Sequence, residues 1–207
     1  PMNQIFVNLK RFEVSRTLGG LCPVDDPIAW IETVIERSVE VGLGSLPDTR
    51  LTYMLPEGLV STAVQRLNAF GAAQKANLAV GCQGVHWEDI VPGKNFGAFT
   101  TSQPATAVRH LGATWAIIGH SEERKAHAQV MAAYDPAVGQ DEMARQKAAR
   151  AVDAVVNAEV LAALKAGLNV LVCVGETAGE RGEGTFEEQQ ARIEQVLSAQ
   201  VGASLKD

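Results

Sequence analysis

The amino-acid sequence predicts an α/β protein with a parallel β-sheet. Short apolar segments recur along the chain, and each is followed by a segment of helical periodicity, so that the order strand–helix occurs five times. Strands of this kind that alternate with helices are typical of a parallel sheet covered on both faces. An open doubly wound sheet and an eight-fold barrel both satisfy the pattern. No internal repeat or low-complexity linker divides the chain, so we expect a single domain.

The expected strands are the apolar segments 4–9, 50–55, 77–82, 115–118 and 169–174. Local signals mark the helices between them. Asp26 and Pro27 suit the N-cap and the first position of the first helix, which glycines end near residue 42. The second helix places its apolar residues, Val60 to Phe70, on one face.

The second half of the chain continues the alternation. A long polar loop, residues 83–101, leads to a helix over 104–111. An Ala-rich helical region then extends to Ala166, with a break at Asp135-Pro136. The last helix is marked by a capping box, Thr185 with Glu188, and by a shared apolar face of Phe186, Ile193 and Leu197.

The composition limits the classes of function and of binding partner that the protein can have. The 207 residues carry a net charge of -6, which speaks against a nucleic-acid partner and leaves room for a locally positive site for a phosphorylated ligand. Cys22, Cys82 and Cys173 are widely separated, and the last two lie in apolar runs, as reduced core residues of a cytoplasmic protein do. No apolar stretch is long enough to span a membrane, and a secretory signal pattern is missing, so we expect a cytoplasmic protein.

Polar residues follow the first strand directly. Asn8 and Lys10 are two residues apart, so both project to the same side of the strand. In parallel α/β folds, function lies at the carboxyl ends of the strands. Lys10 is either a lysine that marks the strand end or a cation held there for an anionic ligand.

His120 follows the strand 115–118 after Gly119, and Ser121 is the expected N-cap of the next helix. The imidazole then lies beside a helix N-terminus, where the positive end of the dipole disfavours imidazolium. A neutral imidazole can donate a hydrogen bond to a carbonyl oxygen that is becoming an enediolate. The alternative is a histidine that only hydrogen-bonds nearby backbone.

The sequence leaves the role of one acidic residue open and favours a structural role for another. Glu122 either supports Lys10 or is a first-turn acid favoured by the helix dipole. Glu176, after the fifth strand, is expected to hold its loop.

The other histidines receive no catalytic role. His86 lies in the polar loop, while His110 and His127 lie in helical stretches whose surroundings suggest solvated faces. No pair of cysteines or histidines has the spacing of a metal site, so we expect no metal.

Four segments match motifs of a known enzyme family in the same order. They are Asn8-Leu-Lys10, His86-Trp-Glu-Asp89 with Gly97-Ala-Phe-Thr100, Gly119-His-Ser-Glu122, and Cys173-Val-Gly-Glu176 with Glu180-Arg181. Through them the chain resembles the triosephosphate isomerase family. The third and fourth segments are the most specific.

The resemblance implies a (β/α)8 TIM barrel. Residues 1–207 would form a single barrel domain that contains five β/α units, while the three C-terminal units of the family lie outside this sequence. It also implies interconversion of dihydroxyacetone phosphate and D-glyceraldehyde 3-phosphate through an enediolate, without a cofactor. A cytoplasmic homo-oligomer that acts in glycolysis and gluconeogenesis, with a small phosphorylated sugar as its substrate, is the corresponding expectation.

The resemblance also assigns roles. Asn8 and Lys10 would bind substrate, His120 would be the electrophile beside Lys10, and Glu122 would support them. The neutral histidine at a helix N-terminus is the device known for triosephosphate isomerase itself. The family's glutamate base and its glycine-rich phosphate grip belong to the three further units.

The chain departs from the family at a charged pair near the family's dimer contact. Thr101-Ser102 and Glu123 stand at the two places, so both members of the pair have changed. The loop 90–95 and the Ala-rich region 126–151 are longer than is usual. We hypothesise a homo-oligomer with an altered interface, in which the Ala-rich segment replaces the lost dimer contacts.

Two further functions fit the same residues. One is a related isomerase of a four-carbon ketose phosphate, which catalytic efficiency on the two substrates would distinguish. The other is a non-catalytic relative that binds sugar phosphates, for which the expected result is ligand binding without turnover.

Overall fold

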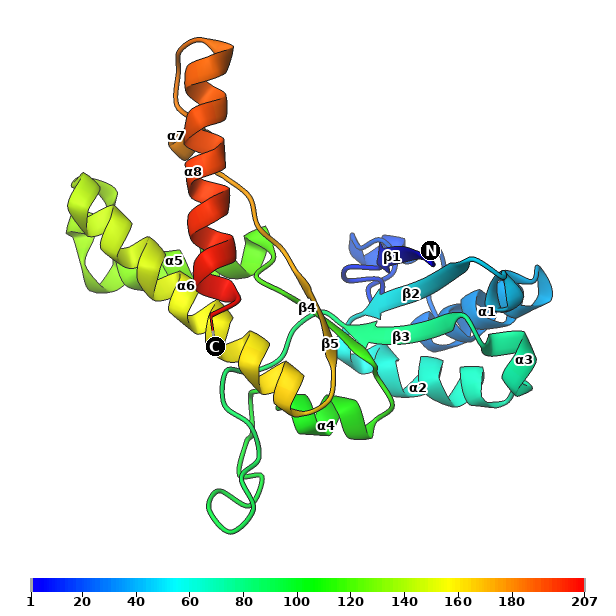
Figure 1. Cartoon of the computed structure of the whole chain (residues 1–207). Coiled ribbons are helices and arrows are strands. Elements are labelled where there is room, and N and C mark those ends of the chain that lie inside the picture. The colour runs from blue at the N-terminus through cyan, green and yellow to red at the C-terminus, as the bar shows by residue number, and fades with distance from the viewer. Residues whose placement is uncertain (1, 207) are drawn as a thin grey trace.

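In the computed structural model, which describes residues 2–206, a five-stranded parallel sheet curls with its strands in chain order (Figure 1). The register brings the carboxyl ends of the strands to one edge, where Asn8 pairs with Met54 and Ile118 with Val172. The strands are β1 (Asn3–Asn8), β2 (Thr49–Leu55), β3 (Leu78–Cys82), β4 (Trp115–Ile118) and β5 (Asn169–Val172).

The curl of the sheet decides between the two architectures that the sequence left open. The rings of Phe6 in β1 and Trp115 in β4 meet edge to face, with centroids 4.6 Å apart. Because β2 and β3 lie between these strands, the contact requires the sheet to fold over its concave face. The fold is therefore part of a (β/α)8 barrel, not an open doubly wound sheet.

The helices pack against one face of this sheet. Ile35, Val60, Val108 and Val156 come from four different helices and are fully buried in one apolar cluster with residues of β2, β3 and β4. Burial of such a side chain contributes roughly 1.5–3 kcal/mol. The expectation of cover on both faces is thus corrected, because the second apolar face lines the barrel interior. The helices are α1 (Pro27–Glu40), α2 (Glu57–Asn68), α3 (Ala72–Lys75), α4 (Ala105–His110), α5 (Ser121–Tyr134), α6 (Glu142–Lys165), α7 (Ala178–Arg181) and α8 (Phe186–Ser204).

Local signals place several helix ends as predicted. The Asp26 carboxylate accepts hydrogen bonds from the Ile28 and Ala29 amides, both at 3.0 Å. The predicted break at Asp135-Pro136 is a short 3-10 turn, Pro136–Gly139, between α5 and α6. Asp141 then caps α6, with its carboxylate 2.8 Å from the Ala144 amide.

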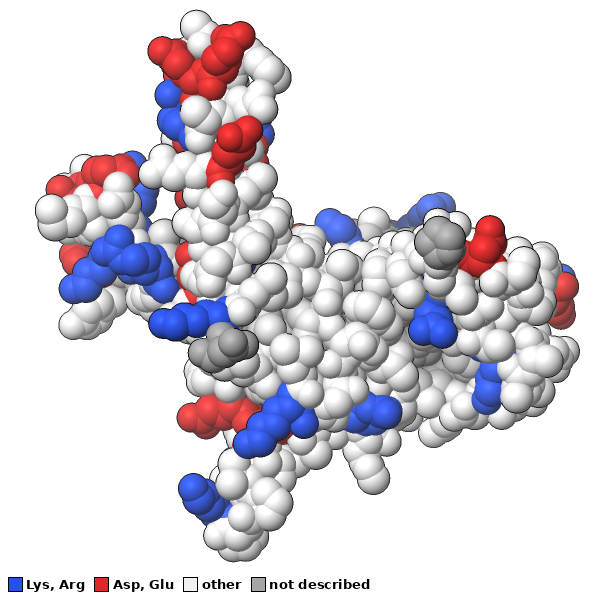
Figure 2. Space-filling model, viewed as in Figure 1, with Lys and Arg blue, Asp and Glu red and all other residues white. Residues whose placement is uncertain are grey.

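The C-terminal helices project from the sheet. The outer part of the α5–α6 hairpin and the helix α8 extend away from the strands, whereas the C-terminal part of α6 packs against the sheet (Figure 1). Acidic side chains gather at the far tip of the arm formed by α7 and α8, at the top of the view, whereas Lys and Arg are dispersed over the visible face (Figure 2). The predicted apolar face of α8 is only partly correct, because Phe186 is 75% exposed while Ile193 and Leu197 are half-buried.

Sequence reasoning missed two helices, α3 and α7, which are too short to show periodicity. The three cysteines are free thiols. Cys82 is buried as predicted, and Cys173 is only half-buried. Within residues 2–206, no helix is long and apolar enough to cross a membrane.

Candidate active site

Asn8, Lys10 and Gln83 form a polar network at the carboxyl edge of the sheet. The Lys10 amide donates to Asn8 Oδ1 at 2.9 Å. The Gln83 side-chain amide, at the end of β3, lies 3.1 Å from the same oxygen and 2.8 Å from the Lys10 carbonyl. It also lies 3.2 Å from the Met54 carbonyl of β2. One side chain therefore ties together the ends of three strands.

This network holds Lys10 in an unusual backbone conformation. Its φ is +39°, a left-handed value that costs a non-glycine residue about 1–3 kcal/mol and is concentrated at functional sites. Lys10 is exposed, and among residues 2–206 it forms no ion pair within 4.0 Å. Its charge is thus available at the barrel mouth for an anionic group.

His120 caps α5, and this corrects the prediction that Ser121 would do so. The imidazole Nδ1 lies 3.4 Å from the Glu122 amide nitrogen, which donates to it. An amide N–H can only donate, so Nδ1 is the acceptor and the ring proton belongs on Nε2. The imidazole therefore has an Nε2–H group with which to contact an oxygen.

The Glu122 side chain does not contact Lys10. It is 77% exposed, and its carboxylate lies 3.5 Å from His120 Nδ1. Of the two interpretations left open by the sequence, the first-turn acid is the one that the geometry favours.

Arg124 fixes the ends of β4 and β5 beneath His120. Its guanidinium donates to the Gly119 carbonyl at 2.8 Å and to the Asp153 carboxylate at 2.7 Å. A third bond, at 3.3 Å, reaches the Cys173 carbonyl. Gly119 has φ +77°, and a Cβ there would lie 2.9 Å from that same carbonyl, so the position requires glycine.

Glu176 holds its loop as predicted. Its carboxylate accepts from Arg181 Nε at 3.0 Å. Its own backbone N–H and the Arg181 guanidinium hold the pKa of Glu176 below its ordinary value.

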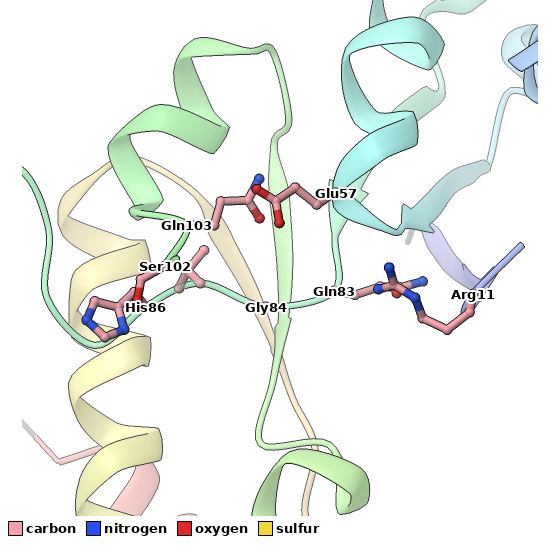
Figure 3. Close-up of a pocket in the computed structure, with 8 residues that line it drawn as sticks. Arg11, Glu57, Gln83, Gly84, His86, Ser102 and Gln103 are labelled. Atoms are coloured by element: carbon pink, nitrogen blue, oxygen red, sulfur yellow. The ribbon is translucent and has the colours of Figure 1, made fainter. Parts of the chain in front are cut away.

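An open depression of about 300 Å³ adjoins the polar network (Figure 3). Gln83 and Arg11 lie at one end and His86 and Ser102 at the other, with Glu57 and Gln103 between them. Lys10 and His120 do not line it. The depression is therefore a polar neighbour of the candidate site and not the site itself.

Gln83 and Arg124 are the site residues that received no role from the sequence. Gln83 is the first residue of the predicted polar loop after the strand 77–82, but nothing local shows that its amide reaches β1 and β2. Arg124 resembles any charged residue of a helix until the fold brings Asp153 and Cys173 to it.

A curled parallel sheet with polar side chains at its carboxyl edge defines the (β/α)-barrel class, whose active sites lie at that edge. The family model described as "Triosephosphate isomerase" matches residues 52–207. The chain belongs to the triosephosphate isomerase family.

Individual relatives agree. A triosephosphate isomerase of Ruegeria sp. (strain TM1040) is 33% identical over 165 residues, 79% of this chain and 50% of the relative. One of Moorella thermoacetica is 34% identical over 113 residues, 55% of this chain and 34% of the relative. The crystal structure of triosephosphate isomerase from Bartonella henselae superposes with a TM-score of 0.61 at 26% identity, covering 100% of this chain and 63% of that one. The matched segments thus span between about a third and a half of the length of the curated relatives.

Proposed function

We propose that the protein interconverts dihydroxyacetone phosphate and D-glyceraldehyde 3-phosphate. The observation that carries the proposal is the hydrogen bond from the Glu122 amide to His120 Nδ1, because it leaves Nε2–H to donate to a carbonyl oxygen. Lys10 and Asn8 are the proposed substrate-binding residues, and Glu122 positions the imidazole through its backbone amide.

In the proposed mechanism, a base removes a proton from the carbon beside the carbonyl. The electron pair moves into the carbon–carbon bond and the carbonyl oxygen becomes anionic. Nε2–H of His120 and the Lys10 ammonium stabilise that oxygen. The contact of Phe6 with Trp115 supports this pairing, since it brings the strands β1 and β4, after which Lys10 and His120 follow, together across the curled sheet. The base is assigned to the part of the family that this chain does not span.

The test is an isomerase assay of the full-length protein on both triose phosphates and on a four-carbon ketose phosphate. We expect higher catalytic efficiency on the triose phosphates. A higher efficiency on the four-carbon substrate would reassign the substrate class, and saturable binding without turnover would identify a non-catalytic binding protein.

We also propose a cytoplasmic homo-oligomer that serves glycolysis and gluconeogenesis and whose interface differs from that of the family. The changed residues Ser102 and Glu123 and the exposed Val130, Tyr134 and Met143 of the α5–α6 hairpin support the altered interface. Shortening the hairpin between residues 126 and 151 should reduce the molar mass in light scattering. An unchanged mass would reject the role of the hairpin.

A further inference from the structure

A second cluster of titratable side chains lies between α5 and α6. Glu123 and His127 are four residues apart on α5, so they share one helix face, and Glu159 faces them from α6. One ligand atom from each of the three residues lies within 4.8 Å of the others. His127 Nε2 is 4.0 Å from Glu159 Oε1.

Glu159 is the unusual member. Its side chain is 4% exposed, and its Oε2 has no hydrogen-bond partner among the described residues. Desolvation, then the charge of Glu123, raise the pKa of Glu159 to about 9. A buried carboxyl oxygen without a partner is costly and needs an explanation.

The nearby cation is already engaged. Arg124 lowers the pKa of Glu159 to a small extent, but its guanidinium is bound to Asp153 and to the Gly119 carbonyl. Glu123 Oε2 accepts from the Gly119 amide at 2.7 Å, which orients that carboxylate. The cluster therefore holds two carboxyl groups and one imidazole around one point.

We propose that Glu123, His127 and Glu159 bind a divalent transition-metal cation such as Zn²⁺ or Mn²⁺. Binding displaces the proton of Glu159, and the two carboxylates then balance the charge of the ion. An imidazole favours a transition metal over Mg²⁺ or Ca²⁺. Zn²⁺ bound at about 2.0–2.2 Å from each atom needs ligand atoms about 3.4 Å apart, so the three side chains must close in slightly on binding. The site joins α5 to α6 and is independent of the proposed isomerase activity.

The probes are Zn²⁺, Mn²⁺ and Co²⁺, each titrated into the metal-free full-length protein by calorimetry. We expect saturable binding of one ion per chain and a rise in melting temperature. We expect no saturation by Mg²⁺ or Ca²⁺ at the same concentrations. Because the chain has three free cysteines, the absorption spectrum of the Co²⁺ form is recorded as well, and it should lack thiolate-to-metal charge transfer.

The variants are His127→Gln and Glu159→Gln, with His110→Gln and Glu194→Gln as exposed controls. Each test variant should weaken metal binding at least about 10-fold, because even mutation of a ligand's hydrogen-bond partner causes a loss of that size. The control variants should bind the metal as the parent does. Far-ultraviolet circular dichroism checks that each variant is folded. Three results would overturn the site: no saturable binding by the parent, equal affinity in all four variants, or a thiolate spectrum of the Co²⁺ form. Glu123 and Glu159 would then be a carboxyl pair that shares a proton.

Discussion

His120 and His127 belong to the same helix, seven residues or about two turns apart, and yet their surroundings differ. Their side chains are almost equally exposed, at 28% and 23%. Nδ1 of His120 accepts from the Glu122 backbone amide, and the Glu122 carboxylate near it, at 3.5 Å, is 77% exposed. Nε2 of His127 lies 4.0 Å from Oε1 of Glu159, whose carboxyl group is buried.

The comparison shows that partner chemistry, more than burial, decides what a histidine can do. A donor at Nδ1 leaves the opposite N–H free to polarise a substrate oxygen. Carboxylates around His127 suit a cation. His127 was expected on a solvated helix face, and this expectation was wrong, because its side chain is half-buried and Glu159 meets it once α6 packs on α5.

The largest expected effect concerns turnover. His120→Gln should lower kcat by about 10²–10⁴-fold, the range for loss of a group that transfers or shares a proton in the transition state, while the fold is unchanged. Steady-state kinetics on dihydroxyacetone phosphate measures it. His110→Gln, an exposed histidine of α4, is the control and should keep full turnover. Near-parental kcat in His120→Gln would remove the catalytic assignment.

The next largest effect concerns stability and Arg124, which lies between the two histidines in the sequence. Arg124→Met should lower the free energy of unfolding by about 3–5 kcal/mol, because it leaves the largely buried Asp153 carboxylate without its partner. Urea denaturation followed by circular dichroism measures it. Arg145→Met is the matched control, since the exposed ion pair of Arg145 with Glu142 contributes about 0–1 kcal/mol. Equal losses in the two variants would show that Arg124 does not organise the strand ends.

Glu159→Gln should raise the free energy of unfolding in metal-free buffer, the opposite of the effect of Arg124→Met. Its raised pKa, about 9, means that between pH 4.5 and 9 the folded state holds a proton that the unfolded state has released, so stability falls as pH rises. The glutamine removes this penalty and should raise the free energy of unfolding by about 1–3 kcal/mol at pH 9.

The gain should shrink as the pH falls below 4.5, toward pH 4, where the unfolded state of the parent is mostly protonated as well. The groups that face Glu159 are Glu123, His127 and Arg124, so each is kept in the variant. Urea denaturation at both pH values, with a chelator present, measures the difference. If the gain in stability does not change with pH, the Glu159 carboxyl group is solvated and its pKa is not raised.

The order of the strands and the ends of the long helices were predictable because they depend on local signals. Apolar runs gave the five strands to within a few residues, and Asp26 and Asp135-Pro136 acted through neighbours two or three residues away. The positions of Asn8, Lys10 and His120 at the carboxyl edge of the sheet were predictable for the same reason, since each lies at or just after the end of a strand.

The remaining features depend on contacts between distant segments. The curl needs Phe6 and Trp115 to meet, although 109 positions separate them in the sequence (115 − 6). Gln83, Arg124 and Glu159 acquire their partners from other elements in the same way. Roles for Asn8, Lys10, His120 and Glu122 in catalysis stay predictions.

The smallest effect tests which residue caps α5. Ser121→Ala should change the free energy of unfolding by less than about 0.5 kcal/mol, because the amide of Glu122 is bound by His120 and not by the serine hydroxyl. Asp141→Ala, which removes the side-chain cap of α6, should cost about 1 kcal/mol and calibrates the measurement. If Ser121→Ala costs as much as Asp141→Ala, the serine is the cap. Nδ1 of His120 would then lose its donor, and the contrast with His127 would disappear.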